Sequence, residues 1–239
     1  MGYPFTDKYW EEHRAFILEN MMGPNALRVT EELTSGLNIV SNMRVLDLGC
    51  GAGLSSILLA EKYDATVFAA DLWISPSDNF SRFKSMGVDR KIVPLFADVT
   101  KGLPFSKEYF DLIICVDAYH YFGANQEMLP LLQTFIRPGG YIAVAVPGLK
   151  KEFTNNKTPE ELAPFLPDNH NFHSLSWWTD LWGSTAGTKL DNCREMDCHR
   201  LAWDEWLQCP NPYAIEDIEM MKTENGQFFN HVQMIAERI

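Results

Sequence analysis

The chain has 239 residues, of which 46% are hydrophobic, so it is long enough to bury a sizeable core. Its net charge of −12 argues against nucleic acid as the substrate, because phosphate contacts require clustered Lys and Arg. Five cysteines lack C-x-x-C spacing and no apolar run approaches the roughly 20 residues of a membrane span, so we expect a cytoplasmic protein with reduced thiols, no zinc site and no membrane segment.

Two helical patterns open the chain. Apolar spacing predicts a helix over about residues 7–21 with Thr6 as its cap, and Gly23-Pro24-Asn25 breaks that pattern. A second short helix is expected to end near Gly36. Residues 1–37 are therefore predicted to form a helical cap ahead of the main fold.

Residues 45–53 read Val-Leu-Asp-Leu-Gly-Cys-Gly-Ala-Gly, a buried strand followed by a turn with glycine at every second position. A helical pattern follows, which is typical of a nucleoside-cofactor site. A dinucleotide fingerprint would need its third glycine where this chain has Leu54. Asp47 precedes the first glycine, and a carboxylate there suits a ligand with an ammonium group. The turn therefore favours S-adenosylmethionine over NAD.

Strand and helix patterns alternate through the first two thirds of the chain. Strands are predicted near residues 43–48, 65–71, 92–97, 111–116 and 141–147, with helices near 53–63, 76–86 and 125–137. This alternation predicts an α/β fold with a doubly wound parallel sheet. Ligands of such sheets bind beyond the carboxyl ends of the strands. We expect one cleft to gather the acids at those ends, which are Asp47, Asp71, Asp98 and Asp117.

The pattern changes after Pro147-Gly148. Residues 149–174 hold breaks, charges and little periodicity, and are predicted to form a mobile loop over the cleft. Beyond them we expect a helix over 174–184, a strand over 188–197, one or two helices within 199–222 and a final strand over 231–239.

Five motifs in chain order carry a family resemblance. They are Asp47-Leu48-Gly49-Cys50-Gly51-Ala52-Gly53, Phe68-Ala69-Ala70-Asp71-Leu72, Phe96-Ala97-Asp98-Val99, the strand Phe110 to Asp117, and Arg137-Pro138-Gly139-Gly140-Tyr141. Through them, roughly residues 40–148 resemble class I S-adenosylmethionine-dependent methyltransferases. The resemblance implies a mostly parallel, seven-stranded Rossmann-like sheet with a helical and loop cover, whose final strand is antiparallel to its neighbours.

The resemblance also implies one methyltransferase domain over residues 1–239. Its parts would be the helical cap 1–37, a cofactor-binding core 38–148, a lid or substrate segment 149–185, and C-terminal strands and helices 186–239.

The resemblance assigns roles to the acids of the core. Asp71 would accept hydrogen bonds from both ribose hydroxyls, and it follows Gly53 at close to the spacing of roughly 20 residues expected of a ribose-binding acid. Asp98 would receive the adenine amino group. The full set expected to contact the cofactor is Asp47, Gly49, Cys50, Gly51, Gly53, Asp71, Leu72, Asp98, Val99, Val116 and Trp10.

Residues after the fourth strand are expected at the methyl-transfer centre. His120 is the candidate base, because neutral imidazole is available at pH 7; the alternative is that it starts a helix and bonds the backbone. Asp117 either orients His120 or holds an amine substrate, or it caps the next helix. Tyr119 and Tyr121 either wall the acceptor pocket or pack in the core.

Aromatic residues of the cap and lid complete the candidates. Tyr9 and Trp10 either fold over the ligand, where aromatic faces attract a sulfonium, or pack on the core. His173 and Trp177 of the proposed lid are candidate substrate contacts. His170 and His173 have no third ligand at useful spacing, so no metal is expected.

The function predicted is methyl transfer from S-adenosylmethionine to nitrogen, oxygen or sulfur of a small molecule. The chain resembles the broad group that contains quinone-biosynthesis, sarcosine and phosphoethanolamine methyltransferases. It lacks the Asp-x-Pro-Pro-Tyr motif of many nucleic-acid and protein amide methyltransferases and has Val116-Asp117-Ala118-Tyr119-His120 in its place. Two alternatives stay open: aminopropyl transfer from a related cofactor, and a cofactor-binding protein without turnover.

Overall fold

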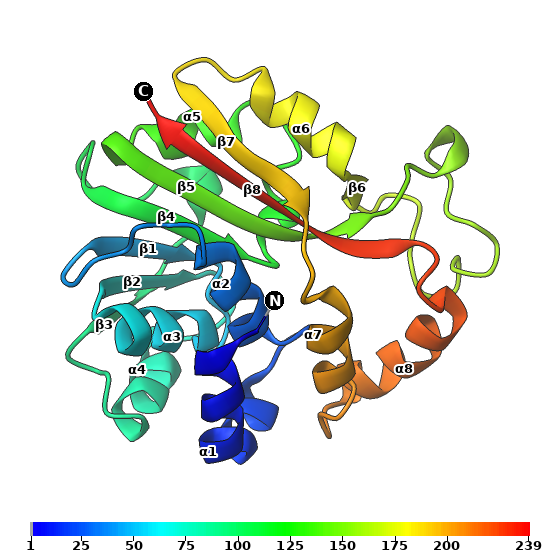
Figure 1. The fold of residues 1–239 in the computed structure, drawn as a ribbon, viewed down its shortest axis with the longest axis horizontal. Helices are drawn as coiled ribbons and strands as arrows, with labels where there is room; N and C mark the ends of the chain where they lie inside the picture. The colour runs from blue at the N-terminus through cyan, green and yellow to red at the C-terminus, as the bar shows by residue number, and fades with distance from the viewer. Residues whose placement is uncertain (1) are drawn as a thin grey trace.

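The computed structural model describes residues 2–239, so position 1 of the expected cap lies outside the described part. A single twisted sheet forms the centre, with helices on both faces (Figure 1). The strand order is β3 (Ile92–Phe96), β2 (Thr66–Asp71), β1 (Arg44–Leu48), β4 (Phe110–Val116), β5 (Ile136–Leu149), β8 (Phe229–Arg238) and β7 (Thr188–Glu195).

Strands β1 to β5 pair in parallel, whereas β8 is antiparallel to both β5 and β7. The predicted doubly wound, mostly parallel sheet of seven strands is thus confirmed, including the antiparallel final strand. An eighth strand, the two-residue β6 (His173–Ser174), pairs beside β5 and was not predicted.

The helices divide between the two faces of the sheet (Figure 1). Apolar side chains of α1 (Pro4–Asn20), α2 (Ala26–Thr34), α3 (Leu54–Tyr63), α4 (Pro76–Ser85) and α7 (His199–Trp206) share one core. Those of α5 (Met128–Gln133) and α6 (Leu175–Gly183) share the other. Helix α8 (Pro212–Glu224) follows α7, and single turns lie at η1 (Val99–Lys101), η2 (Tyr119–Tyr121) and η3 (Thr154–Asn156).

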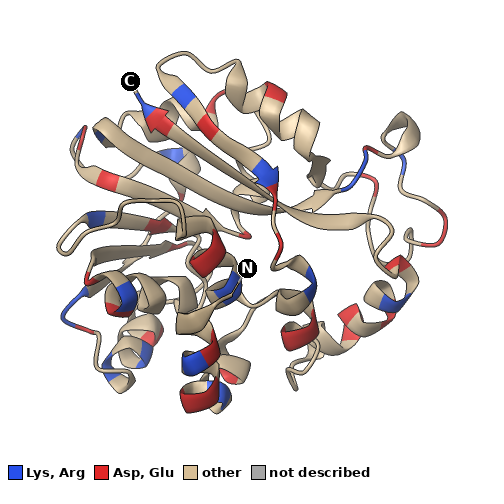
Figure 2. Ribbon diagram, in the orientation of Figure 1, with Lys and Arg blue, Asp and Glu red and all other residues tan. Residues whose placement is uncertain are grey.

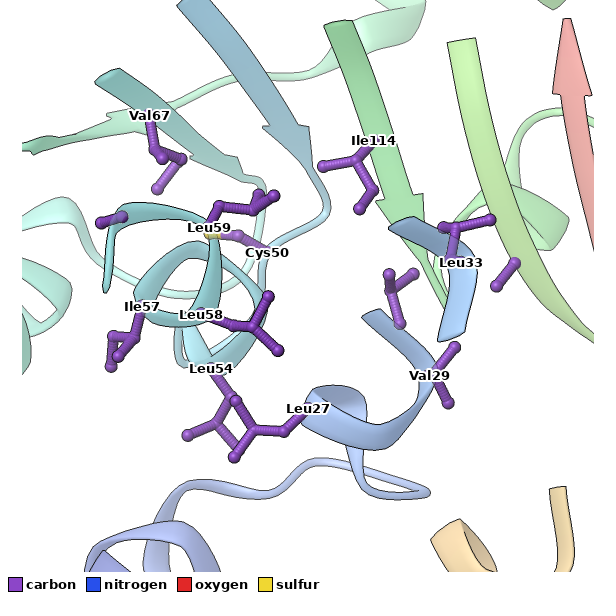
Figure 3. Packing of buried hydrophobic residues seen from close by; sticks show 14 of the residues in the cluster. Leu27, Val29, Leu33, Cys50, Leu54, Ile57, Leu58, Leu59, Val67 and Ile114 are labelled. Carbon is purple, nitrogen blue, oxygen red and sulfur yellow. The ribbon is translucent and has the colours of Figure 1, made fainter. Parts of the chain in front are cut away.

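Helices α2 and α3 pack together against the sheet (Figure 3). Leu27 and Leu33 of α2, Leu58 of α3 and Ile114 of β4 are fully buried in this core. Burial of each such side chain is worth about 1.5–3 kcal/mol. This packing holds the first turn of α3 close to the glycine turn that precedes it.

Two helix predictions needed correction at their ends. The first helix begins at Pro4, and Thr6 lies inside it instead of capping it, because the Thr6 amide donates to Glu31 Oε2 at 2.8 Å. Proline is favoured in the first helical turn, where its missing N–H costs nothing. The predicted helix over 125–137 is shorter, since β5 already begins at Ile136.

The predicted turn at Arg137-Pro138-Gly139-Gly140 lies within the early part of β5. The register of β4 and β5 shifts between Phe110 and Leu112, which absorbs the turn into one long strand. A Cβ on Gly140 would lie 2.8 Å from the carbonyl oxygen of Asp111, so only glycine permits this close approach.

The segment after β5 has a small core of its own. Its buried apolar side chains are Leu149, Phe153, Leu162, Leu166 and, from β8, Phe229. The irregular course predicted for residues 149–174 is confirmed apart from η3 and β6, but the segment packs on the end of β8.

Charged residues lie mainly on helices, loops and the outer strand β7, whereas the central strands carry few (Figure 2). A buried ion pair joins Arg28 of α2 to Glu205 of α7 at 2.7 Å, and Arg28 also contacts the exposed Asp7 of α1. This contact ties the N-terminal helices to α7.

Within residues 2–239, no helix is both long and apolar enough to cross a membrane, and no three His, Cys, Asp or Glu side chains are grouped to hold a metal ion.

Candidate active site

A cleft of about 530 Å³ opens at the carboxyl ends of β1, β2 and β4. The glycine turn after β1 forms its floor. The residues after β2, β3 and β4 form one side, and the end of α1 with the connection to α2, residues 20–24, forms another. The sequence predicted a cleft at this edge of the sheet from its acids, and the structure places it there.

The glycine turn has positive φ angles, which residues with a Cβ adopt only at a cost in free energy. Gly49 has φ 71° and Gly53 has φ 87°. A Cβ on Gly49 would lie 2.4 Å from the Ala118 Cβ, and one on Gly53 would lie 2.4 Å from the Phe83 ring. Gly49 lines the cleft, whereas Gly53 lies behind it as the N-cap of α3.

Asp71 organises the backbone around the cleft. Its Oδ2 accepts from the Gly51 amide at 2.8 Å, and its Oδ1 accepts from the amides of Trp73 at 2.7 Å and Ile74 at 2.8 Å. The carboxylate thus joins the glycine turn to the loop after β2. Asp71 and the next residue, Leu72, both line the cleft, as the ribose role requires.

Asp98 lines the cleft at the end of β3 together with Val99. Its Oδ1 accepts from the hydroxyl and the amide of Thr100, and its Oδ2 pairs with Lys101 at 3.0 Å. These bonds, that from Thr100 first, hold the pKa of the Asp98 carboxyl below its usual value. The group is therefore a hydrogen-bond acceptor near neutral pH.

Asp47 does not line the cleft. It is fully buried below the glycine turn, and its Oδ2 accepts from the hydroxyls of Ser55 and Ser56, both at 2.6 Å. Its Oδ1 has no partner. Burial raises the pKa of Asp47 to about 6. Direct contact of this carboxylate with a cleft ligand is thus not supported by its position.

This raised pKa predicts how stability depends on pH. Between about pH 4 and pH 6 the folded state holds a proton on Asp47 that the unfolded state has lost, so the contribution of Asp47 to stability falls as pH rises through this range. The loss from this group is on the order of 2–3 kcal/mol. We expect the free energy of unfolding of Asp47→Asn, measured by urea denaturation, to gain on that of the wild type as pH rises through this window. A wild-type slope in D47N would contradict this, and removal of the exposed carboxylate in Asp78→Asn is the control.

Asp117 lines the cleft directly after β4, beside Val116. Its backbone is left-handed, with φ 51°, and its amide donates to the Ala145 carbonyl at 2.9 Å. Its carboxylate lies 3.1 Å from Nε2 of His231, a residue of β8. Asp117 is thus held from two strands and does not cap a helix through its side chain.

His120 does not line the cleft. It lies in η2 and its ring is buried against those of Tyr121 and Phe172. Its Nδ1 has no partner, and burial lowers its pKa to about 4, so the ring is neutral near pH 7. Nδ1 of His120 therefore makes no hydrogen bond to the backbone, which was the alternative considered from the sequence. The ring also does not lie on the wall of the cleft.

The two neighbouring tyrosines differ. Tyr119 is fully buried among Trp178, Trp182 and Phe122, so it packs in the core. Tyr121 lines the cleft and is exposed, and its ring meets that of Trp73 edge to face at 5.3 Å.

The other predicted aromatic contacts lie away from the cleft wall. Tyr9 is buried and its hydroxyl donates to Glu61 of α3 at 3.3 Å, while Trp10 packs near Arg14 on α1. His173 stacks on Trp177 at 3.7 Å. Tyr9 and Trp10 thus pack within the fold in this geometry, and no residue of 149–185 lines the cleft.

Cys50 lines the cleft with a thiol that stays protonated. Burial, with the nearby carboxylates of Asp47 and Asp71, holds its pKa well above the usual value. A small side chain at this turn is what the packing requires.

Several wall residues were missed from the sequence. Met22 and Pro24 come from the break between the first two helices, and Trp73 from the loop after β2. His231, behind Asp117, was also missed; its only signal is that it is the ionisable residue within the buried part of β8. Asn79 supports the turn by donating to the Gly51 carbonyl at 2.9 Å.

The charged side chains on the cleft wall are carboxylates. Asp71, Asp98 and Asp117 line it, and within the described residues no Lys, Arg or His does. Such a cleft favours cationic or neutral ligands and disfavours anions. The glycine turn and the acids together suit a nucleoside with a positive charge.

A family model described as a methyltransferase domain matches residues 39–184. Methyltransferase GfsG of Streptomyces halstedii is 29% identical over 146 residues, 59% of this chain and 51% of that protein. The ubiquinone biosynthesis O-methyltransferase of Rickettsia canadensis is 25% identical over 214 residues, 86% of this chain and 88% of that protein.

A solved structure shares the fold. An S-adenosylmethionine-dependent methyltransferase of Geobacter sulfurreducens, in complex with S-adenosylhomocysteine, superposes with a TM-score of 0.66 and 20% identity, covering 95% of this chain and 98% of that one. The chain spans about half the length of the first curated relatives it matches.

Proposed function

Because this chain belongs to the methyltransferase domain family, we propose that it is a class I S-adenosylmethionine-dependent methyltransferase acting on nitrogen, oxygen or sulfur of a small molecule. One observation carries the proposal. The glycine turn meets the carboxylates of Asp71 and Asp98 on one cleft wall that has no cationic side chain within residues 2–239. A cofactor with a sulfonium and an ammonium group matches this charge.

The residues present fit the cofactor. Gly49 lines the cleft with backbone alone, and Asp71 keeps about one of its roughly four acceptor sites for the ribose beside its three backbone donors. When bound, S-adenosylmethionine supplies an activated methyl group on its sulfonium. The residues proposed to hold it are Gly49, Cys50, Gly51, Asp71, Leu72, Asp98, Val99 and Val116, all on the wall.

The protein contributes alignment of the acceptor and exclusion of water from it. Asp117 is the ionisable side chain on the wall after β4, where the acceptor is expected, and Tyr121 with Trp73 forms an aromatic rim there. We therefore place the acceptor contact on Asp117. His120, which lies behind Tyr121, would support this contact only from outside the wall.

The similarity to known proteins also bears on the alternative function of aminopropyl transfer. The family and the relatives are methyltransferases, which favours methyl transfer over aminopropyl transfer. We also propose a cytoplasmic location, because all five cysteines are free and a reducing compartment keeps them so.

The test supplies purified protein with methyl-labelled S-adenosylmethionine and separate pools of small amines, phenols and thiols. We expect S-adenosylhomocysteine and labelled product from at least one pool, and none from Asp71→Ala as the cofactor-deficient control. A parallel assay with decarboxylated S-adenosylmethionine and small amines tests aminopropyl transfer, which would release methylthioadenosine. Cofactor binding without product from any pool would indicate a protein that binds but does not turn over.

A further inference from the structure

We propose that His199 and His231 orient Asp117 so that its carboxylate receives the N–H or O–H of an amine or hydroxyl acceptor. The inference rests on the proposed function and narrows its acceptor class. His231 is a positioning residue here, because it acts through Asp117 and does not line the cleft.

A chain of polar contacts leads from α7 to the cleft. Nδ1 of His199 lies 2.8 Å from Nδ1 of His231. Nε2 of His231 lies 3.1 Å from Oδ1 and 3.3 Å from Oδ2 of Asp117. Three elements, α7, β8 and the end of β4, thus meet through side chains far apart in the sequence.

The hydrogen-bonding capacity of these groups sets the direction of the chain. An ionised carboxylate only accepts, so Nε2 of His231 must carry its proton. We take His231 as the neutral ring: its Nδ1 then has a lone pair, and Nδ1 of His199 donates to it. Burial, with His231 and Lys150 nearby, lowers the pKa of His199 to about 3, which keeps that ring neutral as the scheme needs.

These two polar contacts account for a histidine at the buried position of His231. It is fully buried in β8, where an unsatisfied polar side chain would be costly, and both ring nitrogens are used in this chain. The titratable groups near His199, His231 and Asp117 are His120, Lys150, Cys198, Cys115 and Tyr121. None of these makes a hydrogen bond to Asp117.

Asp117 is presented to the cleft by strained backbone. A left-handed φ is uncommon for a residue with a side chain, and such strain gathers at functional sites. Its side chain keeps 18% exposure, and the carboxylate has more lone pairs than His231 can occupy. The remaining lone pairs accept hydrogen bonds from a ligand.

The same wall disfavours acidic acceptors. A carboxylate or phosphate placed beside Asp117 would meet like charge, with no Lys or Arg among the described wall residues to offset it. An amine or a hydroxyl instead supplies the donor that Asp117 needs. The acceptor class is therefore an amine or alcohol, or a phenol.

The first test reads the two tautomers directly by ¹⁵N NMR of the histidine rings in the full protein without cofactor. We expect the proton of His231 on Nε2 and that of His199 on Nδ1 near pH 7. Asp117→Ala should abolish the preference at His231. A His231 proton on Nδ1 in the wild type, or an unchanged tautomer in D117A, overturns the positioning chain whether or not the protein transfers methyl groups.

The second test measures acceptor recognition with three probes of one shape: benzylamine, benzyl alcohol and benzoate. Their binding to protein saturated with S-adenosylhomocysteine is followed by NMR titration. We expect the amine or the alcohol to bind about tenfold more tightly than benzoate. Failure of both to exceed benzoate overturns the acceptor class. Binding of S-adenosylhomocysteine itself, measured first, reports separately on the proposed function.

Two substitutions of His231 distinguish a positioning role from a purely structural one. A glutamine amide at 231 can place its nitrogen near Nε2, whereas an asparagine amide reaches only near Nδ1. His231→Gln should keep the preference for amine or alcohol, and His231→Asn should lose it by about tenfold. His170→Asn, a half-buried histidine away from the cleft wall, is the control. Equal behaviour of H231Q and H231N contradicts the proposal.

Discussion

Asp71→Ala should lower the affinity for S-adenosylmethionine about 100-fold or more and should also destabilise the fold. The carboxylate accepts from the amides of Gly51, Trp73 and Ile74, so its loss leaves three donors without a partner beside the cleft. Each bond to a charged group is worth about 1.5–3 kcal/mol, and the proposed bonds to the ribose are lost as well. We expect about 3 kcal/mol less stability by urea denaturation, and the affinity is measured by titration calorimetry.

Two further variants sharpen this expectation. Asp71→Asn keeps one accepting oxygen and turns an amide toward a backbone N–H, so its loss should lie between wild type and alanine. Asp78→Ala removes an exposed carboxylate of α4 outside the cleft and should leave affinity unchanged. Wild-type affinity in D71A would remove Asp71 from the cofactor site.

Gly49→Ala should destabilise the protein by about 2–4 kcal/mol and abolish cofactor binding. The added methyl group would lie 2.4 Å from the Ala118 Cβ, and neither backbone can give way without moving the end of β1 from the end of β4. The left-handed φ adds about 1 kcal/mol of strain to the cost of overpacking. Thermal and urea denaturation measure the first effect, and calorimetric titration measures the second.

The chain offers a matched control for this change. Gly87 has nearly the same φ, 73°, but a Cβ there would have nothing within 4 Å. Gly87→Ala therefore carries the strain without the clash, and should cost only about 1 kcal/mol with binding intact. Equal losses in G49A and G87A would show that the close approach to Ala118 is unimportant.

The sheet and its cleft could be predicted because their signals are local. Each buried strand is one apolar run that ends in an acid or a glycine, and parallel strands bring those ends to one edge. Asp71, Asp98 and Asp117 therefore meet on one wall although they are far apart in the sequence. The same rule failed for Asp47, because its carboxylate points below the turn to Ser55 and Ser56.

The remaining parts depend on tertiary packing that leaves no local pattern. In the sequence the α1–α2 connection is recognisable only as a helix break, yet its residues Met22 and Pro24 line the cleft. His231 becomes meaningful only through the pairing of β8 with β5, which brings it beside Asp117. The segment 149–174 does not line the cleft in this structure, and its apolar residues, such as Phe153, share a small core with Phe229.

The central claim is that the cleft beside the glycine turn binds S-adenosylmethionine through its acids. A crystal structure grown with S-adenosylhomocysteine tests it most directly. The account predicts the nucleoside in this cleft, with its ribose hydroxyls on Asp71 and its adenine amino group on Asp98. A cleft that stays empty at saturating ligand, or a nucleoside bound elsewhere on the protein, would contradict it.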